Sequence, residues 1–164
     1  MAEETASNQQ QAQQQFVMQR IYAKDLSFES PQSPGVFREQ WSPQINVELN
    51  TKNEAIVDQG NYEVVLTLTS TAKQGEKTAF LCEVQQAGIF MITGIEGEDL
   101  RRVLATTGPT ILLPYARESI DSIVVKGGFP PVMLAPVNFD ALYQQALAQQ
   151  AAQQGSAEGE TALQ

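Results

Sequence analysis

The sequence predicts an α+β fold in which a four-stranded antiparallel sheet is followed by two main helices and a C-terminal helix. Four segments in the first part of the chain are rich in β-branched and aromatic residues and partly alternate apolar with polar positions. A short turn containing Gly75 separates the third and fourth segments, as in an antiparallel hairpin. Beyond residue 95 the apolar spacing changes to about 3.6 residues, which is the helical period.

The four strands are expected at residues 16–28, 45–50, 62–71 and 78–92. Since side chains alternate across a strand, the last segment should present one packed and one solvated face. The packed face is predicted to carry Phe80, Cys82, Val84 and Gln86, and the solvated face Ala79, Leu81, Glu83 and Gln85. Gly88 is predicted to form a bulge or bend in this strand.

Three helices are expected after the sheet, over 96–108, 109–126 and from Asn138 to about residue 148. Acidic residues open the first helix and Gly108 is predicted to end it, in agreement with the helix dipole and with C-cap preferences. The second should bury one apolar stripe and pair Arg117 with Asp121 on its solvated side. Its predicted stripe consists of Leu112, Ala116, Ile120, Ile123 and Val124.

Both ends of the chain have a polar, glutamine-rich composition. Residues 1–15 and 149–164 are therefore predicted to be disordered tails around one domain at 16–148. Within that domain, residues 29–43 contain three prolines and are expected to form a long irregular connection. Val36, Phe37 and Trp41 in this connection either plug the edge of the core or form a binding surface, and the residues alone leave both possibilities open.

The composition excludes several classes of function. The net charge is -9, which argues against nucleic acid or an anionic membrane surface as the main partner. The chain has no histidine, so histidine-based catalysis and histidine metal sites are ruled out. No carboxylate pair lies on an apolar background, and no apolar run is long enough to span a membrane. We expect no enzymatic activity, no cofactor and no metal.

Acidic residues gather on the solvated side of the predicted sheet. Asp25 and Glu29 are four strand residues apart and therefore share a face. If Glu83 faces the same way, three carboxylates surround Leu81. An ordinary solvated face is the simpler interpretation, and a docking patch for a basic partner is the alternative. Apolar surface that one chain cannot cover also predicts association with further copies of the chain.

Four blocks of the sequence closely resemble the SecB family of bacterial protein-export chaperones. The blocks are Arg20–Glu29, Ala79–Phe90, Leu113–Glu118 and Leu134–Tyr143, in order, within a match from about Phe16 to Leu147. The resemblance implies a cytoplasmic homotetramer, built as a dimer of dimers, without enzymatic activity. It also implies that the protein holds unfolded secretory precursors and delivers them to the export ATPase SecA.

The resemblance carries over three groups of residues. The SecA-binding positions match Asp25, Glu29, Leu81 and Glu83, and the assembly-sensitive positions match Cys82, Val84 and Gln86. The client-binding groove would involve Phe28, Val36, Phe37, Trp41, Leu112, Tyr115, Ile120 and Val124. Two other functions remain as alternatives: an acidic adaptor that binds one folded basic partner, and an enzyme that uses carboxylates alone.

Overall fold

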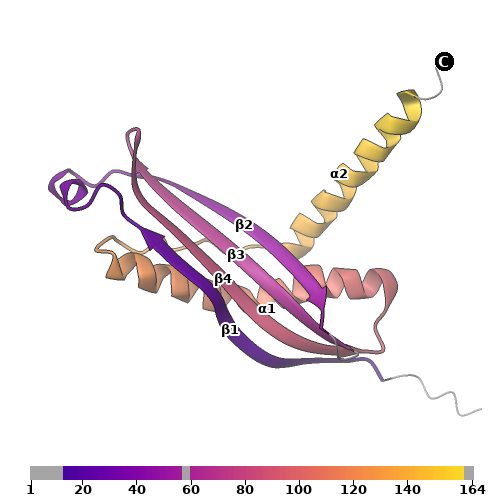
Figure 1. Ribbon diagram of the computed structural model, residues 1–164. Coiled ribbons are helices and arrows are strands. Elements are labelled where there is room, and N and C mark those ends of the chain that lie inside the picture. The colour runs from indigo at the N-terminus through magenta and orange to yellow at the C-terminus, as the bar shows by residue number, and fades with distance from the viewer. Residues whose placement is uncertain (1–12, 57–59, 161–164) are drawn as a thin grey trace, which may run out of the picture.

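The computed structural model describes residues 13–56 and 60–160, with side chains as far as residue 153. A four-stranded antiparallel sheet packs one face against a long helix, and a second helix projects away from the sheet (Figure 1). The elements are β1 (Gln15–Glu29), a 3-10 turn (Gly35–Arg38), β2 (Gln44–Ala55), β3 (Asn61–Gln74), β4 (Lys77–Thr93), α1 (Gly97–Lys126) and α2 (Phe139–Glu160). The α+β class and the four predicted strands are confirmed.

The strands lie in the order β1-β4-β3-β2. β3 and β4 form the predicted hairpin around Gly75, whereas β1 pairs with β4 at the opposite side of the sheet from β2. The connection 30–43 therefore crosses the end of the sheet from one edge to the other. This crossing places its aromatic residues beside the start of β4.

The two central helices predicted from the sequence are one continuous helix, α1. The prediction that Gly108 ends a helix is wrong, and Pro109 and Pro114 both lie inside α1. Gly108 instead allows α1 to approach the sheet, because a Cβ there would stand 3.1 Å from a methyl carbon of Val64. Burial of the helix on the sheet outweighs the local cost of the two prolines.

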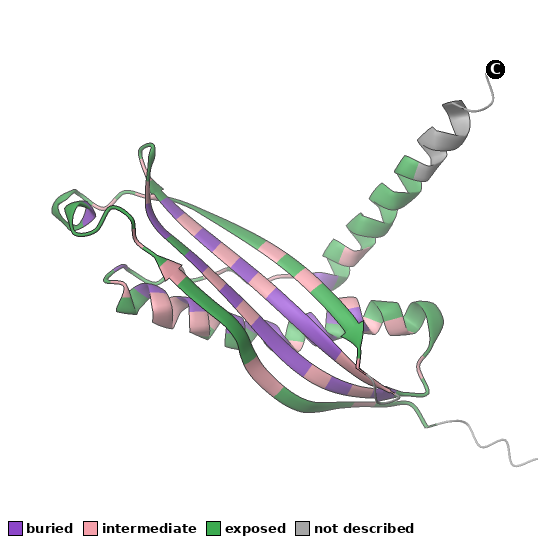
Figure 2. Ribbon diagram, in the orientation of Figure 1, coloured by how far each residue is buried: buried purple, intermediate pink, exposed green. Residues whose placement is uncertain are grey.

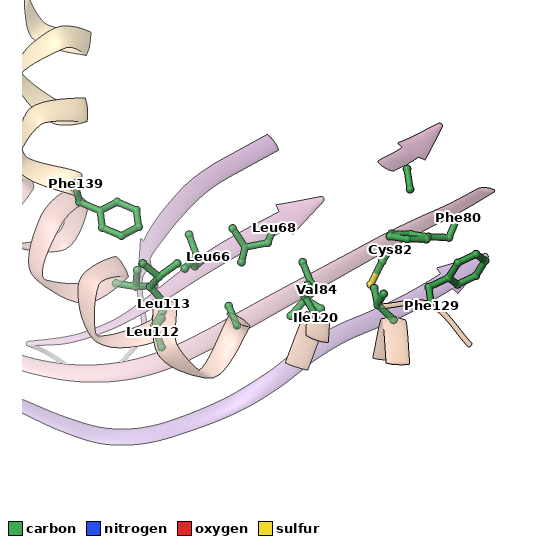
Figure 3. Close-up of a cluster of buried hydrophobic side chains, with 14 of the residues drawn as sticks. Leu66, Leu68, Phe80, Cys82, Val84, Leu112, Leu113, Ile120, Phe129 and Phe139 are labelled. Atoms are coloured by element: carbon green, nitrogen blue, oxygen red, sulfur yellow. The ribbon is translucent and has the colours of Figure 1, made fainter. Parts of the chain in front are cut away.

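The core lies between α1 and the inner face of the sheet, which is the face that packs on this helix (Figure 3). Phe80, Cys82 and Val84 are fully buried and Gln86 is almost so, which confirms the predicted packed face of β4. Burial raises the pKa of the Cys82 thiol to about 11. Figure 2 shows that burial is concentrated on β3 and β4, while the two edge strands are largely exposed. α1 therefore covers the middle of the sheet and leaves its edges open.

No bulge occurs at Gly88, which was one of the two forms predicted for this position. The irregularities between β1 and β4 fall in β1, between Met18 and Arg20 and between Ala23 and Asp25. A Cβ at Gly88 would stand 2.9 Å from the Phe90 ring and 3.0 Å from Leu112. This glycine is thus required for close packing, which sequence periodicity does not reveal.

Three further predictions about local structure need correction. Ala79, predicted to be solvated, is fully buried. β2 continues to Ala55, well past residue 50. α2 runs through residues 149–160, where the sequence predicted a tail without regular structure. Most of the predicted N-terminal tail (1–12) and residues 161–164 lie outside the described residues, so the disorder of these segments stays a prediction.

Candidate binding surfaces

Five aromatic rings meet at one end of the sheet, and we call them the aromatic cluster. Phe129, which follows α1, lies at its centre, and Figure 3 shows it beside Phe80 of β4. The Phe129 centroid is 5.1 Å from those of Phe37 and Phe80, 5.2 Å from that of Trp41 and 6.3 Å from that of Phe28. Phe80 and Phe129 are buried, whereas Phe37 is 52% exposed and Phe28 and Trp41 are half-buried. The cluster is therefore an aromatic surface with a buried base, formed by Phe80 and Phe129, and an accessible rim, formed by Phe28, Phe37 and Trp41.

Two glycines after α1 make room for the rim. A Cβ at Gly127 would overlap the Phe28 ring, and one at Gly128 would stand 3.2 Å from the Phe37 ring. Gly127 has an ordinary φ of -73°, so the requirement for glycine here comes from space and not from backbone conformation.

We expect Gly127→Ala to destabilise the protein by about 1–3 kcal/mol, because the added methyl must displace the Phe28 ring from a packed position. Denaturant unfolding measures the loss. Gly35→Ala is the matched control, since a Cβ at Gly35 meets nothing within 4 Å. Equal stabilities for the two variants would contradict the close approach of Phe28 to Gly127.

A carboxylate of α1 holds the segment that carries Phe129. Asp121 Oδ1 accepts hydrogen bonds from the backbone N–H groups of Val132, at 2.9 Å, and Met133, at 3.2 Å. The predicted pair between Arg117 and Asp121 is absent from the ion pairs of the described residues. Asp121 therefore ties the chain after α1 back onto the helix, instead of forming a solvated ion pair.

The structure brings together some of the predicted groove residues and separates others. Phe28, Phe37 and Trp41 belong to the aromatic cluster, and Val36 is buried at the base of the crossing connection. Tyr115 is exposed on α1 but makes none of the ring contacts recorded among the described residues. The remaining three predicted residues are fully buried under the sheet and inaccessible to a client in this conformation: Leu112, Ile120 and Val124.

Sequence reasoning missed Phe80 and Phe129 as members of the cluster. Phe80 is predicted only for the packed face of its strand, and Phe129 lies between the second and third predicted helices, where the sequence predicts no site. The close spacing of Gly127, Gly128 and Phe129 was the available signal, because paired glycines permit a close approach between a ring and the backbone.

The four predicted docking residues share the outer face of the sheet, on the side away from α1. Asp25 and Glu29 of β1 lie opposite Gln85 and Leu81 of β4, and Glu83 lies between these two rows. Asp25 and Glu29 are exposed, Leu81 is 38% exposed and Glu83 is half-buried. This acidic face therefore has an apolar side chain among its carboxylates, as the alternation of residues predicted.

Neutral neighbours orient the central carboxylate of the acidic face. Thr69 Oγ1 donates to Glu83 Oε2 at 3.1 Å, and Gln85 Nε2 donates to Glu83 Oε1 at 3.2 Å. None of the ion pairs of the described residues involves Asp25, Glu29 or Glu83. The three charges thus remain available to a basic partner.

Another carboxylate on the outer face, that of Glu63, is neutralised internally. Glu63 of β3 accepts hydrogen bonds from the hydroxyl of Tyr22 and, at 2.7 Å, from Lys24 Nζ, both in β1. Burial alone would raise the pKa of Glu63, but these hydrogen bonds outweigh it, so that the pKa falls below its usual value of 4.5. Burial and the hydrogen bond to Glu63 raise the pKa of Tyr22 to about 12. This bridge joins β1 to β3 across β4.

We expect Glu63→Gln to destabilise the protein by about 1–2 kcal/mol at pH 7, because charge-assisted hydrogen bonds are lost from a mostly buried site. Since the pKa of Glu63 is lowered in the folded state, its charge contributes stability above pH 4.5, and that contribution is lost as the pH falls through the lowered pKa. Denaturant unfolding at several pH values should show the difference between the wild type and Glu63→Gln shrinking in acid. A difference that is constant down to pH 3 would contradict this assignment.

The three predicted assembly residues are buried within the fold of the chain. Cys82 and Val84 are in the core, and Gln86 Nε2 donates to the backbone oxygen of Tyr22 at 2.9 Å. Large apolar side chains are exposed elsewhere, on the edge strands: Met18 and Leu26 on β1, and Ile45 and Val47 on β2. The side chains of Cys82, Val84 and Gln86 are thus not on the exposed surface of the chain.

In the part of the chain that the structure describes, no group of acidic or cysteine side chains is arranged to hold a metal ion. Within the same residues, no helix combines the length and apolar character that a membrane crossing requires.

Comparisons with known proteins agree on one family. The family model for the preprotein translocase subunit SecB matches residues 9–150. The protein-export protein SecB of Marinobacter nauticus is 62% identical over 145 residues, which cover 88% of this chain and 87% of that protein. That of Hahella chejuensis is 57% identical over 141 residues, covering 86% of this chain and 88% of that protein.

A solved structure has the same fold at low sequence identity. A SecB-like chaperone of Mycobacterium tuberculosis, in complex with a peptide of the HigA1 antitoxin, superposes with a TM-score of 0.62 at 18% identity. The match covers 75% of this chain and 91% of that one. With this fold, and with a family-model match and high identity over most of its length, the chain belongs to the SecB family of protein-export chaperones.

Proposed function

We propose that this protein holds precursor proteins unfolded in the cytoplasm, without ATP, and delivers them to SecA for Sec-dependent translocation. The observation that carries the proposal is the accessible rim of the aromatic cluster in a chain of the SecB family. The proposed groove consists of this cluster, and its client-contacting rim consists of Phe28, Phe37 and Trp41. We propose no catalytic activity, cofactor or metal for this process.

The physical basis of client capture is burial of apolar side chains that a folded protein would hide. Each client side chain that becomes fully buried contributes roughly 1.5–3 kcal/mol. Several such contacts must offset the cost of ordering the client, so each site needs only weak affinity. Slowly folding precursors keep these side chains available for longer and are therefore captured preferentially.

We further propose that the acidic face of Asp25, Glu29, Leu81 and Glu83 is the docking surface for SecA. Its carboxylates have no cationic partner among the recorded ion pairs, and Leu81 provides an apolar contact in their midst. The acidic face and the client-contacting rim use different residues, so that a protein with a bound client could still dock. Two separate surfaces are what a delivery function requires.

We propose a homotetramer, organised as a dimer of dimers, as the working form. The exposed apolar side chains of the edge strands, such as Leu26, support burial against further copies of the chain. Several grooves on one assembly would bind one long client with increased avidity. Native mass measurement tests this directly, and a stable monomer would contradict it.

The chaperone activity is tested by diluting a denatured secretory precursor into buffer with and without the purified protein, in the absence of ATP. Suppressed aggregation is the expected result, with an equal mass of an unrelated acidic protein as the control. Equal aggregation in all samples would refute the proposed client capture.

The acidic face also supports one other function, that of an adaptor for a single folded basic partner. Such an adaptor would show saturable binding to that partner and none to unfolded chains. An adaptor function does not account for the exposed aromatic rings at the end of the sheet, and we therefore favour the chaperone function.

A further inference from the structure

One side chain outside the aromatic cluster holds the backbone on both sides of Trp41. Gln74 is the last residue of β3, at the start of the hairpin turn. Its Nε2 donates to the backbone oxygen of Gln40 at 2.7 Å, and its Oε1 accepts from the backbone N–H of Ser42 at 3.2 Å. The amide of Gln74 therefore binds the residue before and the residue after Trp41.

The arrangement resembles one further step of sheet pairing. The ladder between β2 and β3 ends at the pair of Gln44 with Lys73. Beyond it, the Gln74 side chain supplies one donor and one acceptor, as a peptide group of a neighbouring strand would. A primary amide can fill both roles at once, whereas a carboxylate can only accept and an alanine can do neither.

At the far end of this loop from Trp41, Ser30 Oγ also donates to the backbone oxygen of Ala79 in the hairpin, at 3.0 Å. Closer to Trp41, the other contacts between the loop and the hairpin are weaker. The Glu39–Lys77 pair is exposed and long, at 3.7 Å, so it contributes little. A crevice of about 70 Å³ separates the loop from the hairpin, with Gly35, Val36 and Glu39 on one side and Gln74, Lys77 and Ala79 on the other. The loop and the hairpin are therefore incompletely packed against each other beside Gln74.

We propose that Gln74 is a positioning residue for the client-contacting rim, because it holds Trp41 against Phe129. This proposal rests on the proposed function of the aromatic cluster in client binding. Gln40 and Ser42 are exposed in the intact protein. When the Gln74 amide is removed, their backbone groups can form hydrogen bonds to water instead. The fold is then kept, while Trp41 leaves its position against Phe129 more often.

Trp41 is the single tryptophan of the chain, so its intrinsic fluorescence reports on this position alone. In the absence of client, collisional quenching of Trp41 fluorescence by acrylamide should rise in Gln74→Ala towards the value for the unfolded chain. Gln44→Ala is the matched control: the same side chain is removed two residues from Ser42, at an exposed position without a recorded side-chain hydrogen bond. Its quenching should equal that of the wild type.

Gln74→Ala should lower the affinity for an unfolded client about tenfold, because the two hydrogen bonds that place Trp41 are lost. Titration with a fluorescently labelled denatured precursor measures this affinity. Gln74→Glu keeps the acceptor for Ser42 and loses the donor to Gln40, so it should fall between the alanine variant and the wild type in both measurements. Far-UV circular dichroism should not change. If Gln74→Ala alters the circular dichroism, the quenching and client affinity of Gln74→Glu decide whether Gln74 positions Trp41.

The outcomes separate this inference from the proposed function. Quenching at the wild-type level in both Gln74 variants overturns the role of Gln74, whatever the client affinities are. Increased quenching with unchanged client affinity overturns its importance for binding. Increased quenching in a protein whose wild type binds no unfolded client supports the role of Gln74 in placing Trp41 and refutes the proposed chaperone function.

Discussion

Phe129→Ala is expected to reduce both client capture and stability, with a loss of about 3–5 kcal/mol in the free energy of unfolding. Phe129 is only 5% exposed and contacts the rings of Phe28, Phe37, Trp41 and Phe80. Its removal leaves a cavity under the rim, which then has no fixed base. Denaturant unfolding measures the first effect and titration with a labelled unfolded precursor the second, below the denaturation midpoint of the variant.

A buried phenylalanine elsewhere provides the control that separates stability from binding. Phe90 is fully buried in the same strand as Phe80 and contacts the tilted ring of Phe16, with ring centroids 5.2 Å apart. Ten residues of strand place it about 33 Å from Phe80. Phe90→Ala should cost similar stability and leave client affinity intact. If both variants lose client affinity equally, the loss reflects general destabilisation, and the aromatic cluster has no specific role.

Glu83→Lys is expected to weaken docking to SecA about tenfold or more, because it places a cation at the centre of a surface proposed to attract a basic partner. Glu83 is held by Thr69 and Gln85, so the substitution also removes an ordered acceptor. Surface plasmon resonance at several salt concentrations measures this loss. The wild-type interaction should weaken with salt, since charges separated by more than about 8 Å are screened at physiological ionic strength.

Glu118→Lys is the control for net charge. Glu118 is exposed on α1, on the other side of the sheet from the acidic face, and its reversal changes the charge of the chain by the same amount. It should leave SecA docking unchanged, and both variants should still suppress client aggregation. If Glu118→Lys weakens docking as strongly, long-range net charge and not the acidic face governs the interaction.

Local patterns in the sequence were sufficient to predict the four strands. The alternation around Phe80 and Glu83 correctly assigned these two residues to the inner and outer faces, because side-chain direction in a strand depends only on parity. The helical region was less predictable. Gly108 and Pro109 are local stop signals, yet α1 passes through them because its burial on the sheet outweighs them.

The two candidate surfaces also differ in how far local sequence patterns predict them. The acidic face lies on two adjacent, regularly paired strands. Spacing along each strand grouped Asp25 with Glu29 and Leu81 with Glu83, and the pairing of β1 with β4 brings the two groups together. The aromatic cluster draws on β1, β4, the crossing connection and the segment after α1, and no spacing rule relates Phe28 to Phe129. Three apolar residues assigned to the groove, Leu112, Ile120 and Val124, are core residues, because amphipathic spacing does not distinguish packing on the protein's own sheet from packing on a client.

By itself, the sequence determined the α+β class, the four strands, the inner face of β4 from Phe80 to Gln86 and the resemblance to the SecB family. Each of these depends on residues that are close together in the chain or on a match along it. Only the tertiary structure decided that α1 is continuous, that Phe129 is the centre of the aromatic cluster and that Gln74 holds the backbone around Trp41. These features arise from contacts between segments that are distant in the chain. The free energy of these contacts outweighs the local conformational preferences, and such contacts produce no periodic pattern in the sequence.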